Sequence, residues 1–322
     1  MKPKIEGLLH DHIDGSAALV GIIKDLYALA GKDFPFPSLE AWRAFFQDPY
    51  EDIVKRFSTV TSVLQSREAL QLAGYAHGKY RAEQGYRYIE AKFAPQYHMF
   101  GGLKMEQAVE AMRSGLKRAE DLCGIKILPV LCINREVDPG TGAKIARVAL
   151  EYDGEVALDL VCDEANHPPE KHRAAYDLTY GTKVRRDCHA GEWVNKEPAA
   201  TYRQRLLQNV RTAVYTLRCD GVGHAIPLAD DPKLVEYVAG NGIRISGAPA
   251  SYLHSGLISD LRDLRIDELL EHDVIYTLNC DDDLFLPPME EVIASCDAAY
   301  NFTAEQAAKL ERNVWLGAFA RR

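Results

Sequence analysis

The chain has 322 residues, of which 47% are apolar and 26% are charged, and its formal net charge is −9. This composition is close to the globular average and excludes a disordered chain, while the length allows two ordinary domains or one large α/β barrel. The acidic balance excludes binding to nucleic acid or to a membrane surface through basic charge, and no apolar run approaches the ~20 residues that span a bilayer.

Eight short runs of apolar and β-branched residues alternate with helical segments along the chain. These runs are Ile5–Ile13, Tyr86–Phe93, Lys126–Ile133, Val156–Cys162, Lys183–His189, Gly221–Ile226, Ile243–Ala248 and Val274–Cys280. Strands that alternate with helices predict an α/β fold with a parallel sheet. Eight repeats in a chain of this length predict one domain over residues 1–322, a closed (β/α)8 TIM barrel. A doubly wound open sheet is the alternative, although it would normally have fewer strands.

Residues 14–85, between the first two runs, form a segment much longer than one crossover helix needs. It contains helical patterns at Leu19–Leu29, Ser38–Phe46 and Ile53–Leu64. An insertion after the first strand of a barrel lies at the C-terminal mouth, where active sites are built. We therefore predict a helical lid or pocket wall, and an extension that only adds packing is the alternative.

The first run ends in a cluster of titratable residues. Because side chains alternate along a strand, His10, His12 and Asp14 are expected to face the same side. Two imidazoles on one face of a strand are a natural pair of metal ligands. The alternative is a pair of surface histidines that bind nothing.

Three later runs also end in titratable residues. The fifth run provides His189 and, after a small-residue turn, Glu192; the sixth provides His224; the eighth is followed by Asp281–Asp283. Three adjacent carboxylates at the end of an apolar strand repel one another unless a cation neutralises them. A solvated loop or a helix N-cap is the alternative for these aspartates, and it fits Asp283 best.

Strands one, five and eight together offer three histidines and one aspartate at their C-terminal ends. The four residues are His10, His12, His189 and Asp281. Nitrogen and oxygen ligands without thiolate suit Zn²⁺, and four protein ligands plus a water make a five-coordinate catalytic site. We predict one Zn²⁺ per chain.

Six segments, spread in order over nearly the whole chain, resemble the adenosine deaminase family of zinc aminohydrolases. They are LLHDHIDGS (Leu8–Ser16), IEAKFAP (Ile89–Pro95), LDLVCDE (Leu158–Glu164), CHAGE (Cys188–Glu192), VGHAI (Val222–Ile226) and LNCDD (Leu278–Asp282). The resemblance implies the same zinc ligands, His10, His12, His189 and Asp281.

The resemblance also implies roles for four other residues. Glu192 matches the carboxyl group that protonates the purine N1, and His224 matches the residue that orients the attacking water and stabilises the developing alkoxide. Asp282 matches the residue that contacts the purine N7. Asp14 matches the position that meets the ribose; because adenine-specific relatives commonly have Glu there, Asp14 favours a nucleoside.

Several positions depart from the pattern of this family. Cys162 replaces the Gly whose backbone N–H meets the purine N3, so a Cβ and a sulfur crowd a substrate-binding position. Ala225 replaces the Gly after the catalytic His, Gly221 replaces a common Arg, and Asp283 replaces a Pro. Ser246 replaces a Glu that usually supports the catalytic His.

The predicted function is zinc-dependent hydrolytic deamination of an adenosine-type purine nucleoside to the inosine-type product and ammonia. The expected partner is therefore a small-molecule purine nucleoside. A related aminohydrolase that acts on a 5′-modified adenosine or on free adenine is the alternative. A third hypothesis, supported by Cys162 and Ser246, is a nucleoside-binding protein that has lost turnover.

Cysteine usage points to a reducing compartment. Seven cysteines are scattered along the chain without a CxxC pair, which favours free thiols in the cytosol. Met1–Leu9 is too short and too mixed in composition for a signal peptide. We therefore expect a cytoplasmic protein.

Overall fold

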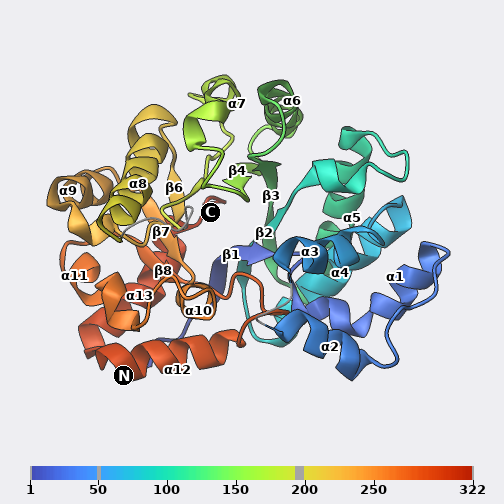
Figure 1. Cartoon of the computed structure of the whole chain (residues 1–322), viewed down its shortest axis with the longest axis horizontal. Coiled ribbons are helices and arrows are strands. Elements are labelled where there is room, and N and C mark those ends of the chain that lie inside the picture. The colour runs from blue at the N-terminus through green and yellow to red at the C-terminus, as the bar shows by residue number, and fades with distance from the viewer. Residues whose placement is uncertain (1, 49–51, 193–198, 321–322) are drawn as a thin grey trace.

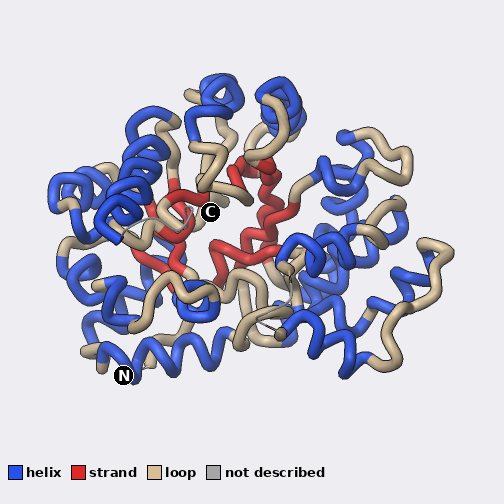
Figure 2. The backbone as a smooth tube through the Cα atoms, in the orientation of Figure 1, coloured by secondary structure: helices blue, strands red, loops and turns tan. Residues whose placement is uncertain are grey.

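Parallel strands gather at the centre of the molecule and helices surround them (Figures 1 and 2). The protein is described by a computed structural model that covers residues 2–48, 52–192 and 199–320. Its strands are β1 (Gly7–His12), β2 (Tyr88–Phe93), β3 (Lys126–Asn134), β4 (Ala157–Val161), β5 (His189–Ala190), β6 (Gly221–His224), β7 (Arg244–Gly247) and β8 (Tyr276–Leu278). Each of the eight predicted runs contains one of these strands or the start of one.

The strands form two parallel four-stranded sheets, with orders β1-β2-β3-β4 and β5-β6-β7-β8. Two isolated parallel bridges link the sheets to each other, one between Asp11 and Asp281 and one between Leu158 and Arg186. The predicted α/β fold with parallel strands is confirmed.

The fifth strand differs from its prediction. The run Lys183–His189 was expected to be extended throughout, but β5 contains only His189 and Ala190. The residues before it reach β4 through single backbone bonds, from Leu158 N–H to the Arg185 carbonyl at 2.9 Å and from Asp187 N–H to the Leu158 carbonyl at 2.7 Å. The run therefore follows β4 without forming a continuous ladder.

Helices lie between the strands and after the last of them. They are α1 (Ile23–Leu29), α2 (Leu39–Gln47), α3 (Ile53–Thr61), α4 (Arg67–Glu83), α5 (Met105–Cys123), α6 (Pro139–Leu150), α7 (Arg173–Thr179), α8 (Ala199–Arg211), α9 (Pro232–Gly240), α10 (Pro249–His254), α11 (Ile266–Glu271), α12 (Met289–Tyr300) and α13 (Ala304–Gly317). Among the described residues, no helix is both long enough and apolar enough to cross a bilayer.

The segment between β1 and β2 is helical, as its patterns predicted, and it contains α1 to α4 (Figure 1). The Ser38 and Ser66 hydroxyls accept bonds from the third residue beyond them and begin α2 and α4. Trp42 and Phe46 of α2 are fully buried, and Phe46 packs against Phe285 in the loop after β8, with ring centroids 5.3 Å apart. The insertion thus contacts the loop that carries Asp281–Asp283.

Charged side chains of opposite sign form a buried row inside the sheets. Lys92 Nζ lies 2.5 Å from Asp159 Oδ2 and 2.9 Å from Asp187 Oδ2. Arg244 continues the row, because its guanidinium lies 2.8 Å from Asp187 Oδ2 and 2.6 Å from Glu90 Oε2. All five residues are fully buried. Buried charges are tolerated only when they are paired in this way.

The same row explains why position 221 is glycine. A Cβ on Gly221 would lie 2.7 Å from Arg244 Nε and 2.9 Å from Asp187 Oδ1. Neither partner can withdraw without leaving its buried ion pair. Gly221 therefore makes room for the arginine that the fold places on β7.

Candidate metal and catalytic site

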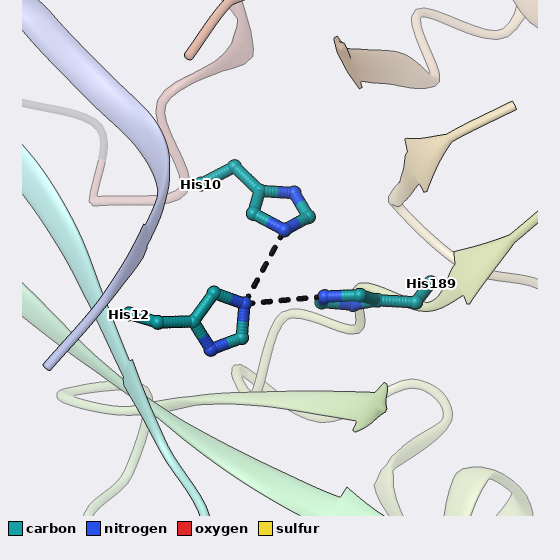
Figure 3. Close-up of side chains that lie close together, drawn as sticks. All are labelled: His10, His12 and His189. Atoms are coloured by element: carbon teal, nitrogen blue, oxygen red, sulfur yellow. Dashed lines mark hydrogen bonds between the residues drawn. The ribbon is translucent and has the colours of Figure 1, made fainter. Parts of the chain in front are cut away.

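Strand β1 sends its polar side chains in two opposite directions, as the alternation predicted. His10 and His12 point toward His189 (Figure 3). Asp11 points the other way, where Arg81 of α4 donates two bonds to its carboxylate, at 2.6 and 2.8 Å. His77 Nε2 lies 3.1 Å from the same carboxylate. Asp11, on one face of β1, therefore belongs to an internal ion pair, while His10 and His12, on the other face, belong to the candidate site.

The four predicted metal ligands lie together. His12 Nε2 lies 3.4 Å from His10 Nε2 and 3.2 Å from His189 Nε2, the contacts drawn in Figure 3. Asp281 Oδ1 completes the group at 3.3 Å from His10 Nε2 and 3.5 Å from His12 Nε2. Residues that are 271 positions apart in the chain meet here because Asp11 of β1 is bridged to Asp281, three residues after the end of β8.

These four separations are close to the spacing of neighbouring ligand atoms around one Zn²⁺. Zinc–nitrogen bonds of about 2.0–2.1 Å at tetrahedral angles place neighbouring ligand atoms about 3.3 Å apart. The outer nitrogens of two imidazoles are already engaged: His10 Nδ1 lies 3.2 Å from Ser246 Oγ, and His189 Nδ1 lies 3.0 Å from Asp159 Oδ2. Such partners orient metal-binding histidines and leave Nε2 for the ion. The donor set therefore fits Zn²⁺.

Burial lowers the pKa of two of the predicted ligand histidines, His10 and His12, and so favours their neutral form. Burial lowers the pKa of His12 to about 4, with the Asp281 carboxylate opposing the shift. Burial likewise lowers the pKa of His10, assisted by the charges of His189 and Lys92. Neutral imidazole is the form that binds a metal.

The backbone turns sharply where the site residues leave their strands. Cys162, His224, Ala225 and Asp281 have positive φ angles of 76°, 68°, 48° and 61°. Non-glycine residues in this region are strained by roughly 1–3 kcal/mol each, and such strain concentrates at functional sites. The left-handed turns aim side chains into the site immediately after β4, β6 and β8.

Glu192 lies beside the ligand cluster at the end of the turn after β5. Its Oε2 is 3.3 Å from His224 Nε2. The turn is held by Glu164, whose carboxylate accepts the backbone N–H groups of Gly191 and Glu192 at 2.7 and 2.9 Å. Burial, together with the negative charges of Asp281 and Glu164, raises the pKa of Glu192 well above its usual value. The side chain can therefore carry a proton near neutral pH.

Asp282 and Asp14 form a second pair of carboxyl groups at the same mouth. Burial and the neighbouring Asp281 and Asp14 raise the pKa of Asp282. Its Oδ1 is buried without a hydrogen-bond partner among the described residues. Gly15 makes room for it, since a Cβ there would lie 1.6 Å from that oxygen. Burial raises the pKa of Asp14 to about 6.

Asp283 corrects the sequence analysis, which placed it in a solvated loop or N-cap. It is buried, its Oδ2 lies 2.6 Å from Arg81, and its Oδ1 accepts the Ala17 N–H at 2.7 Å. One arginine of the insertion thus binds both Asp11 and Asp283. This pair of contacts fixes the loop that carries Asp281.

Cys162 lies at the predicted end of β4, and its side chain is exposed to solvent. All nine predicted site residues are therefore on strand ends or the loops that follow them.

Three contributing residues were not assigned from sequence. Asp159 and Glu164 stand within the segment LDLVCDE, where strand alternation could have marked Asp159 as facing the site. Tyr252 of α10 has its hydroxyl 3.2 Å from His224 Nδ1. No sequence pattern marked Tyr252, because the contact joins two different βα units.

Comparison with known proteins gives a consistent result. The family model described as Adenosine deaminase matches residues 3–322. The chain is 28% identical to an adenosine deaminase from Enterococcus faecalis, over 98% of this chain and 92% of that protein.

Two solved structures have similar folds, each with a TM-score of 0.83 over 99% of this chain. One is an adenine deaminase from Arthrobacter aurescens, at 21% identity and with 94% of its chain covered. The other is an amidohydrolase from B. ambifaria with bound zinc, at 23% identity and with 86% of its chain covered.

Proposed function

Because the chain belongs to the adenosine deaminase family, we propose that it deaminates an adenosine-type purine nucleoside by zinc-dependent hydrolysis. Family membership makes it a hydrolase of carbon–nitrogen bonds. The observation that carries the proposal is the meeting of His10, His12, His189 and Asp281, with His12 Nε2 3.2–3.5 Å from the other three ligand atoms, beside Glu192.

We infer that the two sheets close into one (β/α)8 barrel. The bridges Asp11–Asp281 and Leu158–Arg186 support closure at both seams. Residues 14–85 are then an insertion at the C-terminal mouth, next to the site.

The metal site would take one Zn²⁺ on His10, His12, His189 and Asp281. When bound, zinc supplies a hydroxide nucleophile at neutral pH, because it lowers the pKa of a water to about 7. Ser246 and Asp159 hold two of the ligand rings in place from behind.

Glu192 donates the proton that the reaction needs on the ring. Addition of hydroxide to C6 breaks the aromatic N1–C6 double bond, so N1 takes a proton as the C6–O bond forms. A carboxylic acid with a raised pKa can supply that proton, and such catalysis typically contributes ~10²–10⁴-fold in rate. The C6–N6 bond then breaks, N6 leaves as ammonia with a proton from the added hydroxyl, and the product is a 6-oxopurine.

His224 and Asp282 complete the site. His224 Nε2 lies beside Glu192 and faces the oxygen that attacks C6. Asp282 donates to N7, which is only an acceptor, so the carboxyl group must carry a proton. Its raised pKa and its unpartnered Oδ1 support this role.

The proposed substrate class depends on the contacts that Asp14 and Cys162 would make with the ribose and the purine. A buried Asp14 can accept a ribose hydroxyl, and Cys162 presents its backbone N–H to the purine N3 while its side chain narrows the approach. The alternative substrate is free adenine or a 5′-modified adenosine.

A substrate screen with the zinc-loaded protein tests the proposal. Release of ammonia is measured for adenosine, adenine and AMP, and release of methylamine for N6-methyl-AMP, each with and without a chelator. We expect adenosine to be turned over fastest, and Glu192→Gln to lose at least a hundredfold in kcat. Faster turnover of another purine would replace the substrate. Tight nucleoside binding without ammonia from any compound would leave a binding protein.

A further inference from the structure

Strand seven lacks the carboxylate that would stand behind the catalytic histidine. Position 246 is serine, and its hydroxyl lies 3.2 Å from His10 Nδ1, so it serves a metal ligand. His224 nevertheless has a partner for its inner nitrogen. The Tyr252 hydroxyl, reaching in from α10, lies 3.2 Å from His224 Nδ1.

Tyr252 is held firmly in this position. Its side chain is fully buried, and its oxygen accepts the Ala248 N–H at 2.8 Å. Its ring meets that of His224 edge to face, with centroids 5.5 Å apart. Helix α10 begins with Pro249, a residue preferred in the first helical turn, which sets the direction of the helix.

The other hydrogen bond of the Tyr252 hydroxyl indicates which atom donates in its contact with His224 Nδ1. The backbone amide of Ala248 can only donate, so the tyrosine oxygen is the acceptor of that bond. Among the described residues, His224 Nδ1 is the only other hydrogen-bond partner of this buried hydroxyl, so it is the acceptor that the O–H proton needs. A neutral imidazole with an accepting Nδ1 carries its proton on Nε2. That Nε2 lies 3.3 Å from Glu192 Oε2 and has no hydrogen bond among the described residues.

We propose that Tyr252 is a positioning residue that fixes His224 in the Nε2–H tautomer, with that N–H directed into the site. The inference rests on the proposed function, because the N–H is then aimed at the oxygen that adds to the purine.

Nitrogen NMR of zinc-loaded protein with ¹⁵N-labelled histidine tests the tautomer without turnover. The His224 signals are assigned by comparison with His224→Gln. We expect Nδ1 to appear as the unprotonated nitrogen and Nε2 as the protonated one. The opposite pattern in the unaltered chain overturns the proposal. This measurement needs no tyrosine variant, so the inference stays testable if a variant does not fold.

Kinetics of Tyr252→Phe provide the second test, with Tyr276→Phe as the matched control. Tyr276 is also a buried tyrosine, but its hydroxyl has no hydrogen-bond partner within the described residues. We expect Tyr252→Phe to lower kcat about ten- to a hundredfold, with KM within about twofold, zinc content unchanged and a mixture of His224 tautomers. Tyr276→Phe should match the parent. An unchanged kcat and a single unchanged tautomer in Tyr252→Phe contradict the proposal.

Failure of the inference is distinguishable from failure of the proposed function. A parent protein that releases no ammonia but shows the expected tautomer rejects the function and keeps the positioning role. A parent that deaminates adenosine while Tyr252→Phe is indistinguishable from it keeps the function and rejects the role.

Discussion

The carboxylate of Asp159 lies between a predicted metal ligand and a buried lysine. Its Oδ2 is 3.0 Å from His189 Nδ1 and 2.5 Å from Lys92 Nζ. We expect Asp159→Asn to weaken zinc binding by about 10–100-fold, because the imidazole loses the partner that orients it and raises its basicity. Zinc titration against a competing chelator measures this. Asp187→Asn is the control, since Asp187 contacts Lys92 but no ligand histidine; an equal loss in both variants would assign the effect to the charge row.

Removal of the metal should lower the stability of the protein. His12 Nε2 lies 3.2–3.5 Å from the ligand atoms of His10, His189 and Asp281, and an ion that binds only the folded state stabilises it by mass action, by about 2.7 kcal/mol at a hundredfold excess over Kd. Thermal unfolding should therefore shift downward with a chelator and recover with added Zn²⁺. His12→Ala should abolish that response. A chelator that leaves the parent's unfolding temperature unchanged argues against a bound metal.

Gly221→Ala should destabilise the fold by about 1–3 kcal/mol or more, because the new methyl group overpacks a closed interior. The methyl would lie within 3.0 Å of Arg244 and Asp187, which hold each other in the buried row. Chemical unfolding measures the change. Gly240→Ala is the control, since a Cβ there meets nothing within 4 Å. Equal stabilities for the two variants would mean that the row shifts freely.

His98 should make the protein sensitive to mild acid. Burial lowers its pKa from 6.5 to about 4, and its Nδ1–H donates to the Leu64 carbonyl at 3.1 Å. A lowered folded-state pKa means that the unfolded chain binds the proton more readily between these values. Stability is therefore complete above pH 6.5 and falls as the pH approaches 4, by about 3 kcal/mol for this group.

His98→Asn keeps a donor at the position of Nδ1 and removes the titration. The difference in unfolding free energy between pH 7 and pH 4 should then shrink by about that amount. His272→Asn, at an exposed histidine, should change nothing. A pH dependence of His98→Asn equal to that of the parent would place the acid sensitivity elsewhere.

Phe285 links the helical segment between β1 and β2 to the loop that carries Asp281–Asp283. Its ring lies 4.8 Å from that of Phe57 and 5.3 Å from that of Phe46. Phe285→Ala should destabilise the fold by about 3–5 kcal/mol, and KM should rise severalfold if the insertion forms a pocket wall. Phe285→Leu, which keeps most of the volume, should have smaller effects. Loss of stability with an unchanged KM would favour an insertion that only adds packing.

Local periodicity was sufficient to predict much of the site. Alternation along β1 placed His10 and His12 together and Asp11 on the opposite face, because the period of a strand is fixed by its backbone. The carboxyl ends of parallel strands share one edge, so His189 and Asp281 could be expected near them despite the distance along the chain.

Other features depended on contacts between elements that no local pattern connects. Asp283 was expected in solvent, yet Arg81 of α4 draws it into a buried ion pair. In the sequence, Gly221 is notable only because the family resemblance has an Arg at this position. The structure gives the reason: the Arg244 side chain occupies the space that a side chain at position 221 would need. The contact between Tyr252 and His224 likewise depends on how α10 packs against β6, which no local pattern predicts.

The amino-acid sequence alone therefore determined the strand–helix alternation and which histidines and aspartate would meet, because these follow from backbone periodicity and side-chain chemistry. The roles proposed for the acidic groups follow from the family resemblance. Only the tertiary structure decided which buried donor meets which acceptor. Those pairings depend on how separate βα units pack, and the free energy of each buried polar group depends on the partner that packing brings to it.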